Sequence, residues 1–136
     1  MTANDDFFLT IYSKDLNFKS HYKGTYYLPS EINLDETWEI ALDGFFSSNN
    51  FINEMFISIN CDLFPVQLIN DKSFNSCYLL YNKNVNEQIY QNKYYRLQKY
   101  NINTINISLQ NLKTENILFD ESIDNCYFIF HFRKSK

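Results

Sequence analysis

The sequence predicts an all-β fold, a sandwich or barrel of about eight strands. Residues that favour strands are abundant, including 13 Phe and 11 Tyr, whereas alanine, the best helix former, occurs only at Ala3 and Ala41. Short segments alternate apolar and polar residues at period two, and polar turns separate them. The length suits a single domain, residues 1–136, and no repeat or linker divides it.

In the first half of the chain, alternation predicts strands over residues 7–13, 25–28, 37–45 and 55–61. The first strand has an apolar face made by Phe7, Leu9 and Ile11. A polar loop over residues 14–24 follows it, and Pro29 ends the next strand. These segments therefore read as short strands joined by turns.

The third predicted strand contains the only tryptophan of the chain. Trp38, Ile40 and Leu42 share one face, which is the pattern of a sheet with one side on the core. We therefore expect Trp38 to be buried as a core anchor.

In the second half, strands are predicted over residues 77–81, 104–110, 117–119 and 126–133, with a turn at 113–116. Pro65 lies among apolar residues and indicates an edge or a bulge. Residues 84–100 are ambiguous, because Tyr90, Tyr94 and Leu97 have helical spacing whereas 94–97 also suits a strand. The last strand has the most apolar face, formed by Cys126, Phe128, Phe130 and Phe132.

Charge and hydropathy exclude several classes of function. The net charge is −4 and the pI is about 5.1, so we expect no direct role in binding nucleic acid. The longest apolar runs have about five residues, far short of the ~20 that span a membrane. The N-terminus is acidic where a signal peptide is basic, and we expect a soluble protein made in a reducing compartment. Asp5 and Asp6 are expected to belong to a disordered terminus.

The histidines and cysteines form no recognisable site. His21 and His131 lack any metal-binding spacing, and His131 is expected to point outward from the last strand. Cys61, Cys77 and Cys126 are odd in number and well separated, so neither a disulfide framework nor a zinc site is predicted. We expect all three to be reduced thiols in or near strands.

The remaining polar candidates have structural explanations. The carboxylate pairs Asp35-Glu36 and Asp120-Glu121 lie at strand ends, where charged residues are usually solvated turn residues rather than an acid and a base. The pair Ser47-Ser48 lacks the context of a nucleophile. The sequence therefore predicts no catalytic, cofactor-binding or metal-binding residue, and no enzyme.

One stretch mixes aromatic rings with cations, namely Tyr90, Lys93, Tyr94, Tyr95, Arg96, Lys99 and Tyr100. Such a mixture occurs in platforms that stack on single-stranded nucleic acid or glycans. It also occurs where Tyr and Arg fill a core or a subunit interface. The acidic charge of the chain favours the second interpretation.

Several motifs, taken in order, resemble one family over nearly the whole chain. The most telling are Trp38-Glu39-Ile40-Ala41-Leu42 and Phe130-His131-Phe132-Arg133-Lys134; the others are FFLTIYS at 7–13, LP at 28–29, INL at 32–34, INCDL at 59–63, YLL at 78–80, YYRL at 94–97 and the alternating segment 102–109. Together they resemble the penton-type minor capsid proteins of Polinton (Maverick) elements, adintoviruses and virophages. Two positions depart from that pattern, at 47–50 and near Lys113, as in a divergent or host-domesticated member.

The resemblance implies a single eight-stranded antiparallel jelly-roll β-sandwich. It also implies a structural role without cofactors, as homopentamers at the fivefold vertices of an icosahedral double-stranded DNA virus or virus-like element. The partner would be a double jelly-roll major capsid protein, and the location the virion after synthesis in the host cytoplasm. The alternative is a jelly-roll module that binds carbohydrate or a receptor through the tyrosines of 90–100.

A jelly roll also fixes the place of the last strand, which pairs with the first. Its opposite face, with Tyr127, Ile129, His131 and Arg133, is too mixed to be simply solvated. We expect this face to be a subunit contact.

Overall fold

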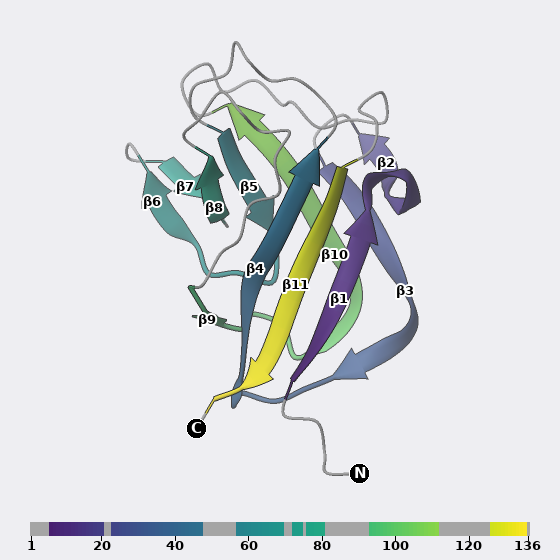
Figure 1. Ribbon diagram of the computed structural model, residues 1–136, viewed down its shortest axis with the longest axis vertical. Coiled ribbons are helices and arrows are strands. Elements are labelled where there is room, and N and C mark those ends of the chain that lie inside the picture. Colours follow the sequence, from purple (N-terminus) through teal and green to yellow (C-terminus); the bar gives the residue numbers. More distant parts are fainter. Residues whose placement is uncertain are drawn as a thin grey trace.

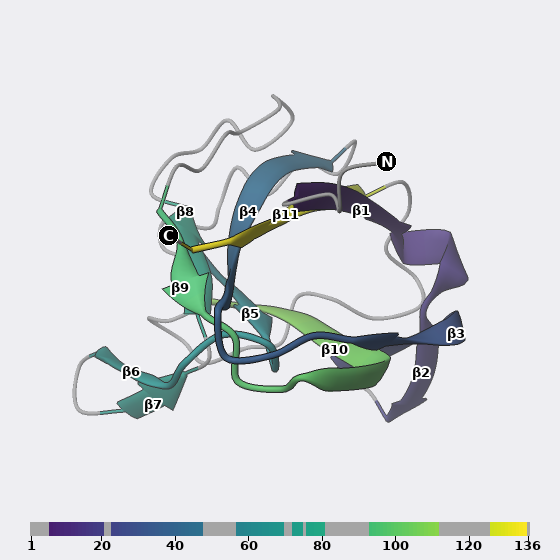
Figure 2. The same cartoon turned by 90° about the horizontal axis from the view of Figure 1, so that it is seen from below.

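The computed structural model describes residues 6–20, 23–47, 57–69, 72–74, 76–80, 93–111 and 126–135. Two antiparallel sheets lie face to face, and Figure 2 shows them as two layers. The described residues contain strands and a single 3-10 turn, η1 (Ser13–Asp15). An all-β sandwich is therefore confirmed. No helix of the described residues is long and apolar enough to cross a membrane.

The first layer is a four-stranded sheet (Figure 1). Its order is β1 (Asp6–Tyr12), β11 (Cys126–Lys134), β4 (Trp38–Ser47) and β9 (Tyr95–Arg96). The predicted pairing of the first strand with the last is confirmed, in an unbroken antiparallel register from Asp6↔Arg133 to Tyr12↔Tyr127.

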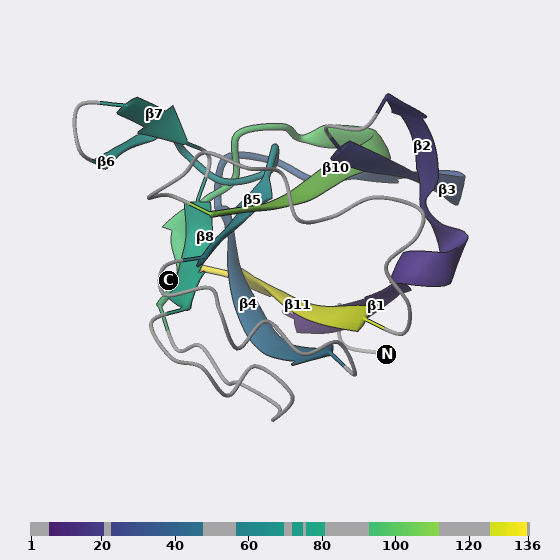
Figure 3. The ribbon, with the colours of Figure 1, turned by 90° about the horizontal axis from the view of Figure 1, so that it is seen from above.

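The second layer is a five-stranded sheet. Its order is β2 (Asn17–Ser20), β3 (Lys23–Asn33), β10 (Asn101–Asn111), β5 (Ile57–Cys61) and β8 (Ser76–Leu80). A separate hairpin of β6 (Gln67–Ile69) and β7 (Lys72–Phe74) projects at one side (Figure 3).

The core lies between the layers and follows the predicted alternation. Its fully buried side chains include Ile11, Ile40, Leu42, Ile59, Ile105, Ile107, Leu109, Phe128, Phe130 and Phe132. Burying one such side chain stabilises the fold by about 1.5–3 kcal/mol relative to exposure. Trp38 is only partly buried, and it packs at the edge of this core with its ring centroid 5.6 Å from that of Phe7. The prediction is thus correct that Trp38 faces the core, but Trp38 is less buried than predicted.

Strict alternation fails in β4 because of a bulge. Phe130 of β11 pairs with Leu42, and the next residue, Ile129, pairs with Gly44, so Asp43 is an extra residue. The inserted residue reverses the side-chain alternation beyond it. Phe45, which unbroken alternation from Leu42 would turn outward, is therefore fully buried.

The predicted ends of the early strands are also wrong. β3 continues past Pro29 and ends at Asn33. Tyr27 pairs with Thr104 and Ile32 pairs with Ile102, so residues 28–31 of β3 lie opposite a single residue of β10 in an irregular section. A proline costs no ladder hydrogen bond at such a site. The predicted loop over residues 14–24 contains η1 and β2, and Gly24 pairs inside β3.

Other predictions are resolved only in part. The strand alternative for residues 94–97 is confirmed by β9, and Pro65 lies between β5 and β6 rather than within a strand. The ranges 113–116 and 117–119, together with Tyr90, fall outside the described residues.

Candidate interaction surface

The side of the four-stranded sheet that faces away from the second layer carries four cross-strand rows. We call this side the outer face. Its register places opposite residues side by side on adjacent strands. The rows are Asp6, Arg133, Glu39 and Arg96; Phe8, His131 and Ala41; Thr10, Ile129 and Gly44; and Tyr12, Tyr127 and Phe46.

His131 is at the centre of this face and both its ring nitrogens have partners. Nδ1 lies 2.5 Å from the Tyr94 hydroxyl, and Nε2 lies 2.9 Å from Oδ2 of Asp6. The ring of Phe8 stacks on the imidazole with centroids 4.3 Å apart. The His131 side chain is therefore only 12% exposed, although it points outward as predicted. Asp6 is an ordered residue of β1, which corrects the expectation that it belongs to a disordered terminus.

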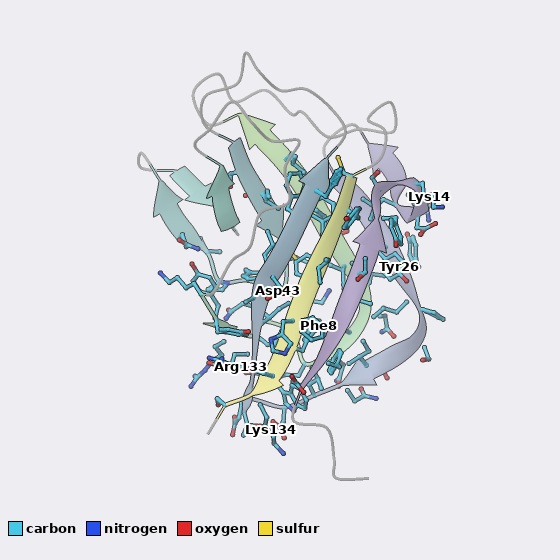
Figure 4. The ribbon with its side chains drawn as sticks, in the orientation of Figure 1. Phe8, Lys14, Tyr26, Asp43, Arg133 and Lys134 are labelled. Carbon is cyan, nitrogen blue, oxygen red and sulfur yellow. The ribbon has the colours of Figure 1, made fainter. Side chains whose placement is uncertain are left out.

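Arg133 is held beside this histidine by two further contacts. Its Nε donates to Oε1 of Glu39 at 2.8 Å, and its guanidinium carbon lies 3.4 Å from the centroid of the Tyr94 ring. Arg133 lies near the lower end of the sheet (Figure 4). With Glu39, Lys134 and Ser135 it lines a cavity of about 340 Å³. The guanidinium carries five N–H donors, so most of them remain for a molecule that docks here.

The opposite end of the outer face is aromatic. The ring of Tyr127 lies 5.6 Å from that of Tyr12 and 5.3 Å from that of Phe46, measured between centroids. These rings, with Ser13, Lys14 and Cys126, line a cavity of about 300 Å³. Phe8 and Tyr12 are 58% and 47% exposed, so β1 presents large apolar side chains to solvent. The outer face is thus ionic at one end and aromatic at the other.

The predicted aromatic stretch is split between two sides of the sheet. Tyr94 lies on the outer face against His131, whereas Tyr95 pairs with the inward residue Ile40 and packs on Phe64, with centroids 5.6 Å apart. Tyr100 is exposed elsewhere. The described rings of this stretch therefore form no common platform.

The outer side of the five-stranded sheet has a different character. Its short polar side chains bond to one another: the Thr25 hydroxyl donates to Asn106, Asn60 donates to Ser108, and Ser58 bonds to Asn60 and Ser76. Ser58 and Ser76 are buried. This side is therefore polar but largely satisfied within the chain.

Asp62, part of the INCDL segment at 59–63 but without a predicted role, fixes the turn after β5. Asp62 accepts from the backbone N–H of Asn106 at 3.1 Å, from its side-chain amide at 2.9 Å, and from Lys99 at 3.2 Å. Lys99 also donates to the carbonyl of Thr104. A charged residue directly after a strand is the only sequence signal for this role. These contacts join the turn to β10, a structural task.

Asp35 likewise serves a turn, as the sequence predicts. The backbone N–H of Thr37 donates to Oδ1 of Asp35 at 2.9 Å, and the Thr37 hydroxyl donates to the same oxygen. The hydroxyl bond and then the backbone bond favour the ionised form and lower the pKa of Asp35. The group is fully exposed, and its task is to close the turn that leads into β4.

Among the described residues, the other predicted candidates form no further site. Cys61 and Cys126 are thiols buried in the core, and within the described ranges no three His, Cys, Asp or Glu side chains gather as a metal site would require. The remaining candidates, or their side chains, fall outside the described residues: His21, Ser47, Ser48, Cys77, Asp120 and Glu121.

No protein-family model and no curated protein sequence matches the chain.

Proposed function

We propose that this protein is a penton-type minor capsid subunit built on a single jelly roll. The observation that carries the proposal is the nesting of the strand pairs. If the edge strand β2 and the separate hairpin β6–β7 are set aside, eight strands remain. They pair from the chain ends inward: β1 with β11, β3 with β10, β4 with β9, and β5 with β8.

Such nesting arises when one long antiparallel hairpin wraps around a sandwich. Successive pairs alternate between the layers: β1–β11 and β4–β9 lie in the four-stranded sheet, and β3–β10 and β5–β8 in the five-stranded sheet. Eight strands wrapped in this way make a jelly roll, an architecture common in viral capsid and lectin domains. The motif resemblance favours the capsid role among these.

A capsid role is mechanical and needs no catalytic residue or cofactor. Five copies around an axis require a heterologous contact, in which one patch meets a different patch on the next copy. The outer face suits one side of such a contact, because Arg133 is fixed by Glu39 and Tyr94 and keeps donors available. In this proposal the ring closes the fivefold vertex of a virion, among trimers of a double jelly-roll major capsid protein.

Sizing with mass measurement tests this proposal. We expect purified protein to form a species near five times 16.4 kDa, alone or with the major capsid protein. Arg133→Ala is expected to keep the fold and shift the population toward smaller species. Asn103→Ala, an exposed change on β10, is the matched control and is expected to assemble normally. The proposal would be contradicted if the protein stays monomeric at high concentration and also does not bind the major capsid protein.

A second candidate, a carbohydrate- or receptor-binding jelly roll, rests on the aromatic row at the other end of the outer face. Tyr12, Phe46 and Tyr127 line a cavity beside Lys14, and aromatic rings stack on the apolar faces of sugars. A glycan array with the wild type and Tyr12→Ala separates the candidates. Binding that the substitution removes would favour this second role, and no binding would eliminate it.

A further inference from the structure

In the part of the chain that the structure describes, the two sheets of the sandwich have four edges, and three of them carry features that prevent edge-to-edge association. Natural edge strands are commonly protected by shortness, irregular pairing, lysine, or coverage by a neighbouring segment. β9 has two residues, and β2 has four, with an irregular register and a lysine in its sequence. β8 pairs irregularly with β5, and the side-chain amide of Gln67 donates a hydrogen bond to the backbone carbonyl of Ser76, the first residue of β8, at 2.6 Å.

Among the described residues, the fourth edge, β1, has none of the first three protections, and η1 follows directly at its C-terminal end (Figure 1). β1 is seven residues long, its register with β11 is unbroken, and its sequence contains neither proline nor lysine. Among the described residues it is hydrogen-bonded to a strand on one side only. Every second residue of such a strand directs its N–H and C=O groups away from the sheet.

The side chains of β1 also leave apolar surface uncovered on both sides of the sheet. Phe8 and Tyr12 are exposed on the outer face, while Phe7 and Leu9 on the inner face are only half-buried at the edge of the core. A further strand beside β1 would cover both sets. The edge therefore offers backbone donors and acceptors together with apolar surface, the two requirements for strand addition.

We infer that β1 is a docking edge for a second copy of this chain, which pairs through its own β1 in the antiparallel sense. A register centred on Thr10 puts Phe8 of each copy opposite Tyr12 of the other. The Thr10 residues then face each other at the axis, and Leu9 faces Ile11. Aromatic pairs and threonine pairs are among the favourable cross-strand combinations.

The self-complementary side chains of β1 select the second copy as the occupant. Asp6 lies at one end of β1 with its side chain 57% exposed, and beyond the other end η1 carries Lys14 beside Asp15. In the register centred on Thr10, Phe8 and Tyr12 cover each other, and Asp6 lies away from both rings. A register centred on Leu9 would instead set Asp6 opposite Tyr12 and Phe8 opposite Thr10.

This contact is isologous and twofold, so it goes beyond the proposed ring, which needs a heterologous contact on other patches. The two β1 strands would join the four-stranded sheets of two copies into one continuous sheet. The inference therefore does not depend on the capsid role.

Engineered cysteines test the register directly. Residues that face each other across antiparallel strands have Cβ atoms about 4.5–5.5 Å apart, close enough for a disulfide after small adjustments. We expect Thr10→Cys to form a covalent dimer near twice 16.4 kDa under mild oxidation, read on a non-reducing denaturing gel that dissolves any ring. The wild type and Ser30→Cys, an exposed change on β3, are the controls. Cross-linking of Thr10→Cys no faster than that of Ser30→Cys would overturn the inference.

A second experiment places a charge at the twofold axis of the dimer. Thr10 is exposed, so Thr10→Lys is expected to fold as the wild type does, which circular dichroism checks. Two lysines directly opposite each other repel, and we expect the dissociation constant of the dimer to rise at least about tenfold. Ser30→Lys controls for the added charge. Self-association of Thr10→Lys equal to that of the wild type would refute a β1 contact. In a mixture of Phe8→Cys and Tyr12→Cys, a disulfide between two Phe8→Cys copies rather than between the two variants would refute this register.

Discussion

The two faces of β11 differ in burial and in partners, although their residues alternate along one strand. The inner residues Cys126, Phe128, Phe130 and Phe132 are at most 1% exposed and contribute by packing. The outer residues His131 and Arg133 each have defined polar and aromatic partners. The inner face therefore determines the fold, whereas the outer face is free to carry a function.

The outer side of the five-stranded sheet sharpens this contrast. Its Ser, Thr and Asn side chains bond to one another, and two of its serines are buried. The outer face of the four-stranded sheet instead exposes Phe8, Tyr12 and Arg133. Phe8, Tyr12 and Arg133 thus lie exposed together on one outer side of the sandwich.

The largest expected effect is the loss of both faces together. Deletion of residues 126–136 removes the strand that lies between β1 and β4, so each of these loses a neighbour. We expect the truncated chain to show no cooperative thermal unfolding by circular dichroism. A cooperative transition would show that β11 is an appended strand and would contradict its central place.

A change on the inner face alone is expected to be the next largest. Phe130 is fully buried, and Phe130→Ala should lower the free energy of unfolding by about 3–5 kcal/mol, the usual cost of such truncations. Trp38→Ala, at the partly exposed edge of the core, should cost less. Urea unfolding measures both, and equal losses would mean that burial does not distinguish the two sites.

A change on the outer face is expected to cost less again. His131→Ala removes the contacts to Tyr94 and Asp6 and the stacking on Phe8, but water can reach Asp6, which is largely exposed. We expect a loss of about 1 kcal/mol, the typical net value of an intramolecular hydrogen bond. A loss as large as that of Phe130→Ala would place His131 in the core rather than on a binding face.

The inner face could be predicted from the sequence, and the outer contacts could not. Period two places Phe128, Phe130 and Phe132 on one side whatever the tertiary structure. The partners of His131 are separated from it by 125 and 37 positions, so they become neighbours only through the pairing of β1 and β11 and the position of β9. The bulge at Asp43 was not predicted, although the adjacent Gly44 is a local signal for it, since a glycine inside a strand often marks a bulge.

The smallest expected effect lies outside both faces, at the turn before β4. The folded state lowers the pKa of Asp35 below 3.8 through the bonds from Thr37, so the ionised group stabilises the fold above that pH. This contribution is lost as the pH falls through the folded-state pKa. We expect Asp35→Asn to lower the urea midpoint slightly at pH 6 and the difference to shrink toward pH 2. A difference independent of pH would assign the effect to shape rather than charge.

We proposed that the outer face closes a fivefold ring, and electron microscopy of the purified protein, alone and with the double jelly-roll major capsid protein, is the most direct test. We expect class averages with fivefold symmetry for the wild type and few rings for Arg133→Ala at the same concentration. Class averages without fivefold symmetry for the wild type in both samples would contradict it.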